Sequence, residues 1–372
     1  MRILCLSTTL LIACVCACGR AEAPAPIPTA AGHAQRVVIV SIDGGRPDVI
    51  LRAKAPNLRA LMKDGSFSFW ARTTEVSVTL PSHASMITGC TPEKHGINFN
   101  KDVPEDELVY PKVPTIFELA KQRGLSTAMA SGKSKFVALC KPGSIDYPLV
   151  PQAKQSFNDT QVADNASKAI IQHRPQVMLV HFAGGDKIGH AMGWGTQQQV
   201  DEIEVIDAGI GKIVDTLKKQ KLYDTTLIIL SADHGGAARS HGKDDPRSRH
   251  IPWIAVGPGI RKDFDLTTFK DLVINTEDTF ATACSFMSIP APDNIDGKAI
   301  TQMIEGAELL QNAPKTAGNK PATKPVAQGF TDPVTKLTYT YQDPYPGVAI
   351  SDFKSCAGVP QPSDKTIPGW DE

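Results

Sequence analysis

The chain has 372 residues, of which 41% are apolar and 21% charged, and its 39 Lys and Arg residues are matched by 39 Asp and Glu residues. This length and composition are typical of one large globular domain with appendages. A formal net charge of zero excludes a surface built to coat nucleic acid, so we expect no specific nucleic-acid partner.

The first 18 residues have the pattern of a signal peptide. Arg2 precedes an apolar run, residues 3–17, that is too short to span a bilayer stably. Small residues before a cysteine resemble the lipobox of bacterial lipoproteins, with Cys18 as the first choice of lipidated residue and Cys14 as the second. The alternative is a plain cleaved signal. The Ala- and Pro-rich residues 19–36 predict a stiff linker. We therefore expect an exported, periplasmic or envelope lipoprotein that meets the membrane only through its anchor.

Beyond the signal segment, four cysteines remain at Cys90, Cys140, Cys284 and Cys356. An even number in an exported chain permits disulfides, and the spacing does not choose among the three possible pairings. No Cys-x-x-Cys pair occurs, so a thiolate metal site is not expected.

Strands and helices alternate through most of the chain. We expect strands at residues 36–42, 126–130, 175–182, 225–231 and 251–257, and helices at residues 56–62, 113–123, 165–173, 197–219 and 277–287. The strand segments are largely continuous apolar runs, typical of strands buried on both faces of a sheet. The alternation predicts an α/β fold, a mostly parallel central sheet with helices on both faces.

The alternation stops near residue 305, so we expect a catalytic domain over residues 37–304 and a Pro-rich tail over residues 305–372. Residues 312–328 have the composition of a flexible linker. Residues 337–341 are expected to add one edge strand.

Acidic and imidazole side chains follow three of the predicted strands. They are Asp43, Asp186 with His190, and Asp233 with His234, and His241 comes shortly after the last pair. Asp186 and His190 are expected in a glycine-containing loop. The carboxyl ends of parallel strands meet at one edge of a sheet, where open α/β sheets place their sites. Carboxylate and imidazole ligands in this number suit two divalent ions, and we expect Zn²⁺.

Thr79 is the candidate nucleophile. Proline is tolerated in the first turn of a helix, so Pro81 places Thr79 at the mouth of a helix N-terminus, where backbone donors favour an anion. A threonine alcohol needs a base or a metal to lower its pKa before it can attack. Lys133 and Lys135 follow a strand end and either reach an anionic substrate or are solvated. His95 is expected to be a hydrogen-bonded turn residue.

Taken together, these segments resemble the alkaline phosphatase superfamily and, within it, the type I phosphodiesterase/nucleotide pyrophosphatase family. The resemblance runs from about Val37 to Ile300. Its motifs are Ser41-Ile42-Asp43-Gly44, Thr79-Leu80-Pro81-Ser82-His83, Thr88-Gly89 with His95-Gly96-Ile97, Asp186-x-x-Gly189-His190 and Ser231-x-Asp233-His234-Gly235.

The resemblance implies a two-metal hydrolase with a phospho-threonine intermediate. It implies that one ion is held by Asp43, Asp233, His234 and the Thr79 alkoxide, and the other by Asp186, His190 and a third histidine. His241 is the favoured third histidine and His250 the alternative.

The substrate class stays open on the sequence. Ser82, Lys133 and Lys135 are the expected substrate-binding residues. Ser82 stands where nucleotide pyrophosphatase relatives usually have asparagine, which weakens a diesterase assignment because its shorter side chain reaches less far. Lys133-x-Lys135 is similar in position to a Lys-x-Arg pair with which monoesterases of the superfamily bind phosphate. We expect a phosphate-ester small molecule or nucleotide as substrate. The alternatives are a phosphomonoesterase, a sulfate or phosphonate ester hydrolase, and a metal-stabilised envelope binding protein.

Overall fold

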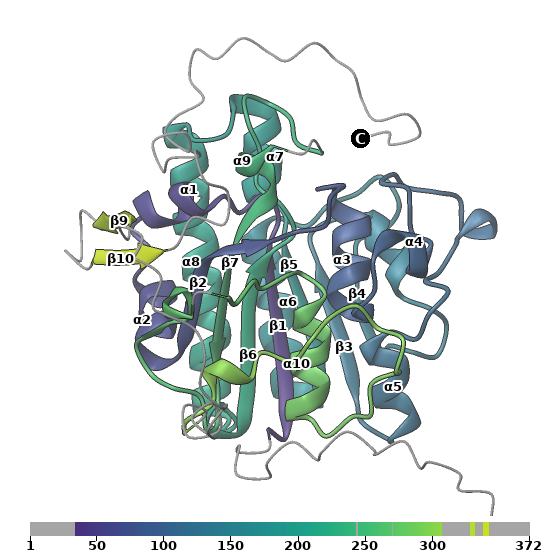
Figure 1. The fold of residues 1–372 in the computed structure, drawn as a ribbon. Helices are drawn as coiled ribbons and strands as arrows, with labels where there is room; N and C mark the ends of the chain where they lie inside the picture. The colour runs from purple at the N-terminus through teal and green to yellow at the C-terminus, as the bar shows by residue number, and fades with distance from the viewer. Residues whose placement is uncertain (1–33, 243–244, 270, 307–327, 332–337, 342–372) are drawn as a thin grey trace, which may run out of the picture. The chain divides into compact units, whose positions relative to one another are not determined.

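The computed structural model describes residues 34–242, 245–269, 271–306, 328–331 and 338–341 (Figure 1). The predicted signal segment, the spacer up to residue 33, Cys356 and most of the Pro-rich tail lie outside these residues. Export and lipidation therefore stay predictions. Within the part of the chain that the structure describes, no helix combines the length and hydropathy needed to cross a bilayer.

An eight-stranded sheet forms the centre of the described fold, in the order β4-β3-β5-β1-β6-β7-β2-β8. The strands are β1 (Arg36–Ile42), β2 (Ser66–Arg72), β3 (Thr127–Ser131), β4 (Tyr147–Leu149), β5 (Val177–Phe182), β6 (Thr226–Ala232), β7 (His250–Val256) and β8 (Phe264–Asp265). Strand β7 is antiparallel to both of its neighbours, β6 and β2, and the other pairings in this sheet are parallel. The prediction of a mostly parallel α/β sheet is confirmed.

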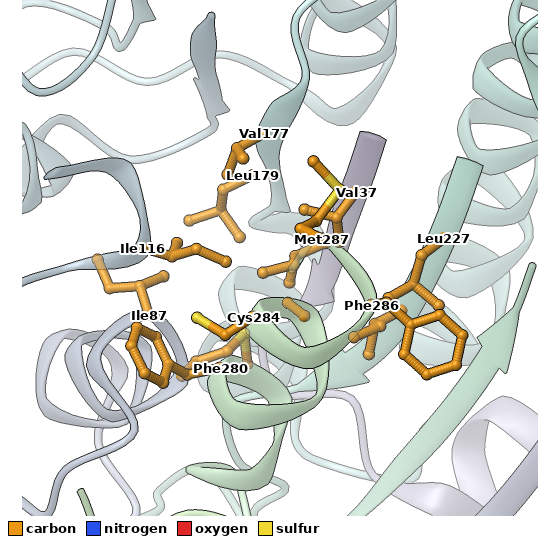
Figure 2. Close-up of a cluster of buried hydrophobic side chains, with 14 of the residues drawn as sticks. Val37, Ile87, Ile116, Val177, Leu179, Leu227, Phe280, Cys284, Phe286 and Met287 are labelled. Carbon is orange, nitrogen blue, oxygen red and sulfur yellow. The ribbon is translucent and has the colours of Figure 1, made fainter. Parts of the chain in front are cut away.

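Helices cover both faces of this sheet (Figure 1). They are α1 (Pro47–Arg52), α2 (Pro56–Asp64), α3 (Thr79–Thr88), α4 (Pro92–His95), α5 (Ile116–Gln122), α6 (Asp159–His173), α7 (Gly184–Met192), α8 (Gln197–Lys219), α9 (Pro246–Arg249) and α10 (Asp278–Phe286). Alternate residues of β1 enter opposite cores. Val37 belongs to the core that contains Phe280 of α10 and Ile87 of α3, as Figure 2 shows. Val38 belongs to the core on the other face, with helices that include α8.

Apart from shifts of one to three residues at the ends of elements, three predictions differ from the structure. Helix α6 begins at Asp159, earlier than the predicted residue 165, because Asn158 and Gln161 form a capping box at its start. Asp186 and His190 lie on α7 instead of in a loop. Strand β10 (Thr338–Tyr341) pairs with β9 (Gln328–Thr331) in a separate two-stranded sheet, so it is not an edge strand of the central sheet.

The cysteines of the described part carry free thiols. Cys90, Cys140 and Cys284 form no disulfide with one another, and Cys90 and Cys284 are buried. Burial raises the pKa of the Cys140 and Cys284 thiols to about 12, so these side chains act as small apolar groups of the core.

Gly89 fixes the end of α3, the helix that carries Thr79. It has a left-handed backbone with φ of 68°, and its N–H donates to the Ser85 carbonyl. A Cβ at this position would lie 2.5 Å from Cδ1 of Phe280 on α10. Two features therefore require glycine at this position, namely the left-handed backbone conformation and the close approach of the Phe280 ring.

Gly89→Ala should lower the free energy of unfolding by about 2–4 kcal/mol, the sum of left-handed backbone strain and overpacking against Phe280. The matched control is Gly124→Ala, because Gly124 has φ of 71° but no atom within 4 Å of the place where a Cβ would lie. The control should cost about 1 kcal/mol, from backbone strain alone. Urea denaturation measures both values, and equal losses would show that the contact with Phe280 does not matter.

Candidate metal and catalytic site

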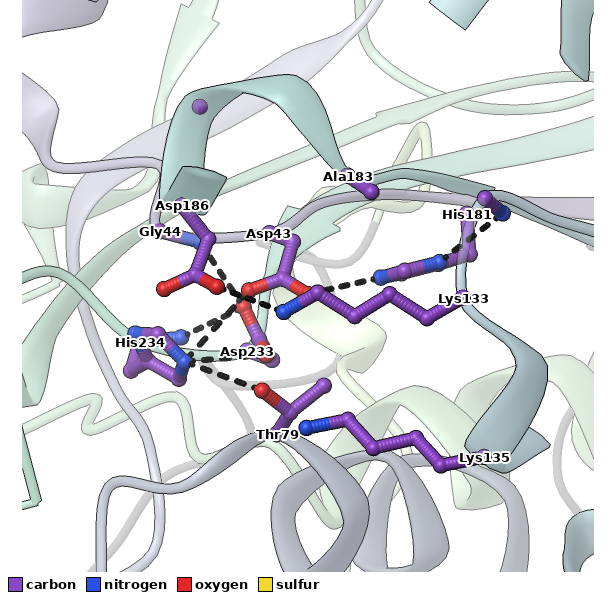
Figure 3. A network of polar contacts seen from close by, with 12 residues as sticks. Asp43, Gly44, Thr79, Lys133, Lys135, His181, Ala183, Asp186, Asp233 and His234 are labelled. Atoms are coloured by element: carbon purple, nitrogen blue, oxygen red, sulfur yellow. Dashed lines mark hydrogen bonds and ion pairs between the residues drawn. The ribbon is translucent and has the colours of Figure 1, made fainter. Parts of the chain in front are cut away.

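The fold brings the three predicted acidic strand ends to one edge of the sheet. Strands β5, β1 and β6 are parallel neighbours in the sheet. Asp43 comes directly after β1, Asp233 directly after β6, and Asp186 lies in the first turn of the helix that follows β5. All three side chains are buried and face one another (Figure 3).

The first group consists of Asp43, Asp233 and His234, whose candidate ligand atoms all lie within 4.8 Å of one another. The Nε2 atom of His234 is 3.4 Å from Asp43 Oδ1 and 3.3 Å from Asp233 Oδ2. The same Nε2 atom is 3.5 Å from the Thr79 hydroxyl. Thr79 is the first residue of α3, so its hydroxyl stands at the positive end of the helix dipole.

The second group consists of Asp186, His190 and His241. Asp186 and His190 are one turn apart on α7, with Asp186 Oδ1 3.3 Å from His190 Nε2. His241 completes the group from the segment after β6. Its Nε2 atom is 3.1 Å from His190 Nε2, and its Nδ1 atom is 2.8 Å from the Ser77 carbonyl.

His250, the alternative third histidine, lies elsewhere. It is the first residue of β7, and its ring stacks on Trp70 with 4.3 Å between the ring centroids. Burial, with a smaller contribution from the Arg72 charge, lowers the pKa of His250 to about 3. The structure thus brings His241, and not His250, to the other candidate ligands.

Each of the three carboxylates is anchored through one oxygen and leaves the other without a hydrogen bond. The anchored oxygens accept from His181 Nε2 for Asp43, from Lys133 Nζ for Asp186, and from the Gly44 N–H for Asp233. The remaining oxygens are buried and have no hydrogen-bond partner among the described residues. Buried carboxylate oxygens aimed beside imidazole nitrogens are what a divalent metal needs, so the residues present fit two ions.

The electrostatics of the site also favour bound cations. Burial and the neighbouring Asp43 carboxylate raise the pKa of Asp233 well above its usual range. Burial would raise the pKa of Asp186 as well, but the Lys133 ammonium lowers it well below that range. One ammonium therefore does not compensate the three carboxylates, and further positive charge would relieve their mutual repulsion.

Lys133 and Lys135 both point into the site (Figure 3). The Lys133 Nζ atom is 2.7 Å from Asp43 Oδ2 and 2.5 Å from Asp186 Oδ2, so it bridges the two groups. The Lys135 Nζ atom donates to Asn100 Oδ1 over 2.7 Å. Burial and the charge of Lys133 lower the pKa of Lys135 to about 8. Both amines thus contact residues of the site, while contact with an anionic substrate stays a prediction.

Ser82, in contrast, is turned away from the candidate ligands. Its hydroxyl donates to the Asp233 carbonyl and lies 2.7 Å from the Thr73 hydroxyl, so it ties the start of α3 to the end of β6. These contacts give Ser82 a structural role and do not support substrate contact. His95 has the turn role predicted for it, because its Nδ1 atom accepts from the Ile97 N–H.

Two residues of the site were missed by the sequence prediction. Asn100 Oδ1 accepts from the backbone N–H of Leu80, next to Thr79, and lies in a segment without periodicity that could have indicated it. His181 holds Asp43 through its Nε2 atom, and its Nδ1 atom lies 3.0 Å from the Ser131 hydroxyl. A histidine inside the apolar run of β5 was a signal for such a role.

The geometry defines a candidate two-metal hydrolase site, and comparisons with known proteins place the chain in a family. A family model described as type I phosphodiesterase / nucleotide pyrophosphatase matches residues 37–245. An uncharacterised pyrophosphatase/phosphodiesterase of Schizosaccharomyces pombe is 26% identical over 229 residues, which are 56% of this chain and 46% of that protein. The chain thus spans less than half of that relative. It belongs to the type I phosphodiesterase/nucleotide pyrophosphatase family.

Solved structures of other proteins have a fold similar to that of this chain. Murine ectonucleotide pyrophosphatase/phosphodiesterase 5, in an inactive form in complex with AMP, has a TM-score of 0.60 at 16% identity, covering 73% of this chain and 100% of that one. A 2-O GAG sulfatase has a TM-score of 0.58 at 14% identity, covering 73% of this chain and 74% of that one. At these identities the likeness concerns the fold alone, which is alkaline-phosphatase-like.

His241→Ala should reduce the zinc bound at saturation from about two ions per chain to about one, because the second group loses one of its three ligands. His250→Ala is the matched control, since this histidine is also buried but stacks on Trp70. The control should bind as much zinc as the unmodified protein. Metal analysis after dialysis measures the content, and a larger loss in His250→Ala would reassign the ligand.

Proposed function

We propose that this chain is a metal-dependent hydrolase of phosphoric esters, phosphodiesterase- or nucleotide pyrophosphatase-like, in which Thr79 is the nucleophile. The observation that carries the proposal is the position of the Thr79 hydroxyl. It lies at the N-terminus of α3, 3.5 Å from His234 Nε2 of the first ligand group, and the His234 ring stacks on His241 of the second group at 3.8 Å between ring centroids. Family membership supports the same chemistry.

The proposed metals are two Zn²⁺ ions. Asp43, Asp233 and His234 would hold one, and Asp186, His190 and His241 the other. When bound, the ions lower the pKa of the Thr79 hydroxyl and neutralise charge on the phosphoryl oxygens and the leaving oxygen.

The chain's own groups position the reacting atoms. The deprotonated Thr79 oxygen attacks phosphorus in line as the bond to the ester oxygen breaks, and water then hydrolyses the phospho-threonine. The Leu80 N–H donates to Asn100 Oδ1, so the asparagine side chain stands at the helix mouth beside Thr79. There it holds the Lys135 amine, which we propose binds a phosphoryl oxygen.

Thr79→Ala should lower turnover of bis-p-nitrophenyl phosphate by about 10³-fold or more, because the nucleophile is lost. Zinc content should stay near that of the unmodified protein, since three other ligands remain in the first group. Thr88→Ala is the matched control, because Thr88 lies on the same helix and its hydroxyl donates to the Ala84 carbonyl. Steady-state kinetics and metal analysis are the measurements. Undiminished turnover in Thr79→Ala would remove Thr79 from its proposed role.

A second candidate function, phosphomonoesterase, is favoured by the two amines in the site. A phosphate monoester is a dianion and a diester a monoanion, so a monoester gains more from extra positive charge. Lys133 offsets part of the charge of Asp43 and Asp186, and the Lys135 amine, partly buried and held by Asn100, supplies positive charge for a substrate. For nucleotides, the candidate substrates are therefore pyrophosphate or diester bonds on the first proposal and terminal phosphates on the second.

Lys135→Met should separate the two candidates, because it removes the charge and keeps most of the length of the side chain. For a monoesterase, kcat/KM for p-nitrophenyl phosphate should fall about 10- to 100-fold, while that for bis-p-nitrophenyl phosphate changes little. Lys141→Met is the control, because Lys141 is an exposed lysine paired with Glu118. Equal falls for both esters would favour the diesterase. Absence of hydrolysis by zinc-loaded protein would leave only a binding role.

A further inference from the structure

Trp194 is a fully buried residue between α7 and α8 that the proposed chemistry does not use. Its backbone N–H donates to the Ala238 carbonyl over 2.7 Å. Its indole N–H donates to the Gly44 carbonyl over 3.1 Å. Gly44 directly follows Asp43, so one indole is tied to the segment that carries a candidate ligand of the first group.

The indole ring also packs closely against the backbone next to two further candidate ligands, His190 and His234. A Cβ at Gly189, the neighbour of His190, would lie 2.7 Å from the ring. A Cβ at Gly236, two residues after His234, would lie 2.3 Å from it. Both positions therefore require glycine so that the ring can fit between α7 and the segment after β6.

The ring meets the second group directly. It contacts His190 edge-on at 5.1 Å between centroids and His241 at 5.8 Å. A backbone carbonyl also holds each of these two imidazoles through its Nδ1 atom, Arg239 for His190 and Ser77 for His241. The two histidines are thus confined by the indole and these carbonyls.

On the basis of the proposed two-metal site, we infer that Trp194 is a positioning residue. It fixes the positions of the two ligand groups relative to each other. Buried carboxylates repel, and segments that carry them separate unless packing fixes them. Trp194 touches the segments after Asp43 and His234 and the rings of His190 and His241. Replacing a residue that does not bind the metal but orients its ligands typically lowers metal affinity by about ten- to a hundredfold.

The test compares Trp194→Phe with Trp253→Phe in the full chain. Trp253 is equally buried, and its indole N–H donates to Thr279 on α10 over 3.1 Å, so the control loses the same kind of hydrogen bond. Zinc affinity is measured by competition with a chromophoric chelator, and stability of the zinc-free proteins by urea denaturation. We expect similar losses of stability in both variants, and a loss of zinc affinity of about tenfold or more in Trp194→Phe alone.

Indole fluorescence gives a second, independent readout. Zinc binding should change the emission of the unmodified protein and of Trp253→Phe, because the Trp194 ring contacts His190 and His241. This change should vanish in Trp194→Phe. Unchanged zinc affinity in Trp194→Phe would overturn the inference. Failure of the unmodified protein to bind about two zinc ions would instead contradict the proposed function, so the two failures are distinguishable.

Discussion

The repulsion among three buried carboxylates is the constraint on which the site depends. Asp43, Asp186 and Asp233 converge in a buried place, and each keeps one oxygen without a hydrogen bond among the described residues. Burying such charges is unfavourable unless cations accompany them. The Lys133 ammonium supplies one positive charge. Two divalent ions held by the same oxygens and by three histidines would more than offset the remaining negative charge, which is why we regard the cluster as a metal site.

The central sheet and its helices hold these three carboxylates in fixed positions. Three adjacent parallel strands, β5, β1 and β6, carry the acidic residues to one edge, and their alternate residues pack into cores on both faces. Helix α3 ends at Gly89, which lies close to Phe280 of α10, and Thr79 is at the N-terminus of this helix. For the proposed role of Thr79 as nucleophile, the first residue of a packed helix offers both the helix dipole and a fixed position, and both would favour reaction with an anionic phosphoryl group.

The sequence predicted the parts of this arrangement that follow from periodicity. The strand at residues 36–42 and the helix at residues 197–219 have the predicted bounds, since long apolar patterns determine them. Helix α7 was missed because its first two residues are glycines and its length is short. Asn100 could not be found, because only long-range folding brings it to Leu80. The pairing of β10 with β9 instead of the main sheet is likewise a tertiary outcome.

The most direct test of the central claim is X-ray diffraction from zinc-soaked crystals, recorded on both sides of the zinc absorption edge. The account predicts two anomalous peaks. One should lie among Asp43, Asp233 and His234 with Thr79 in its coordination shell, and the other among Asp186, His190 and His241. A single peak, or peaks away from these side chains, would contradict the claim that the buried carboxylates exist to hold a pair of metal ions beside the threonine.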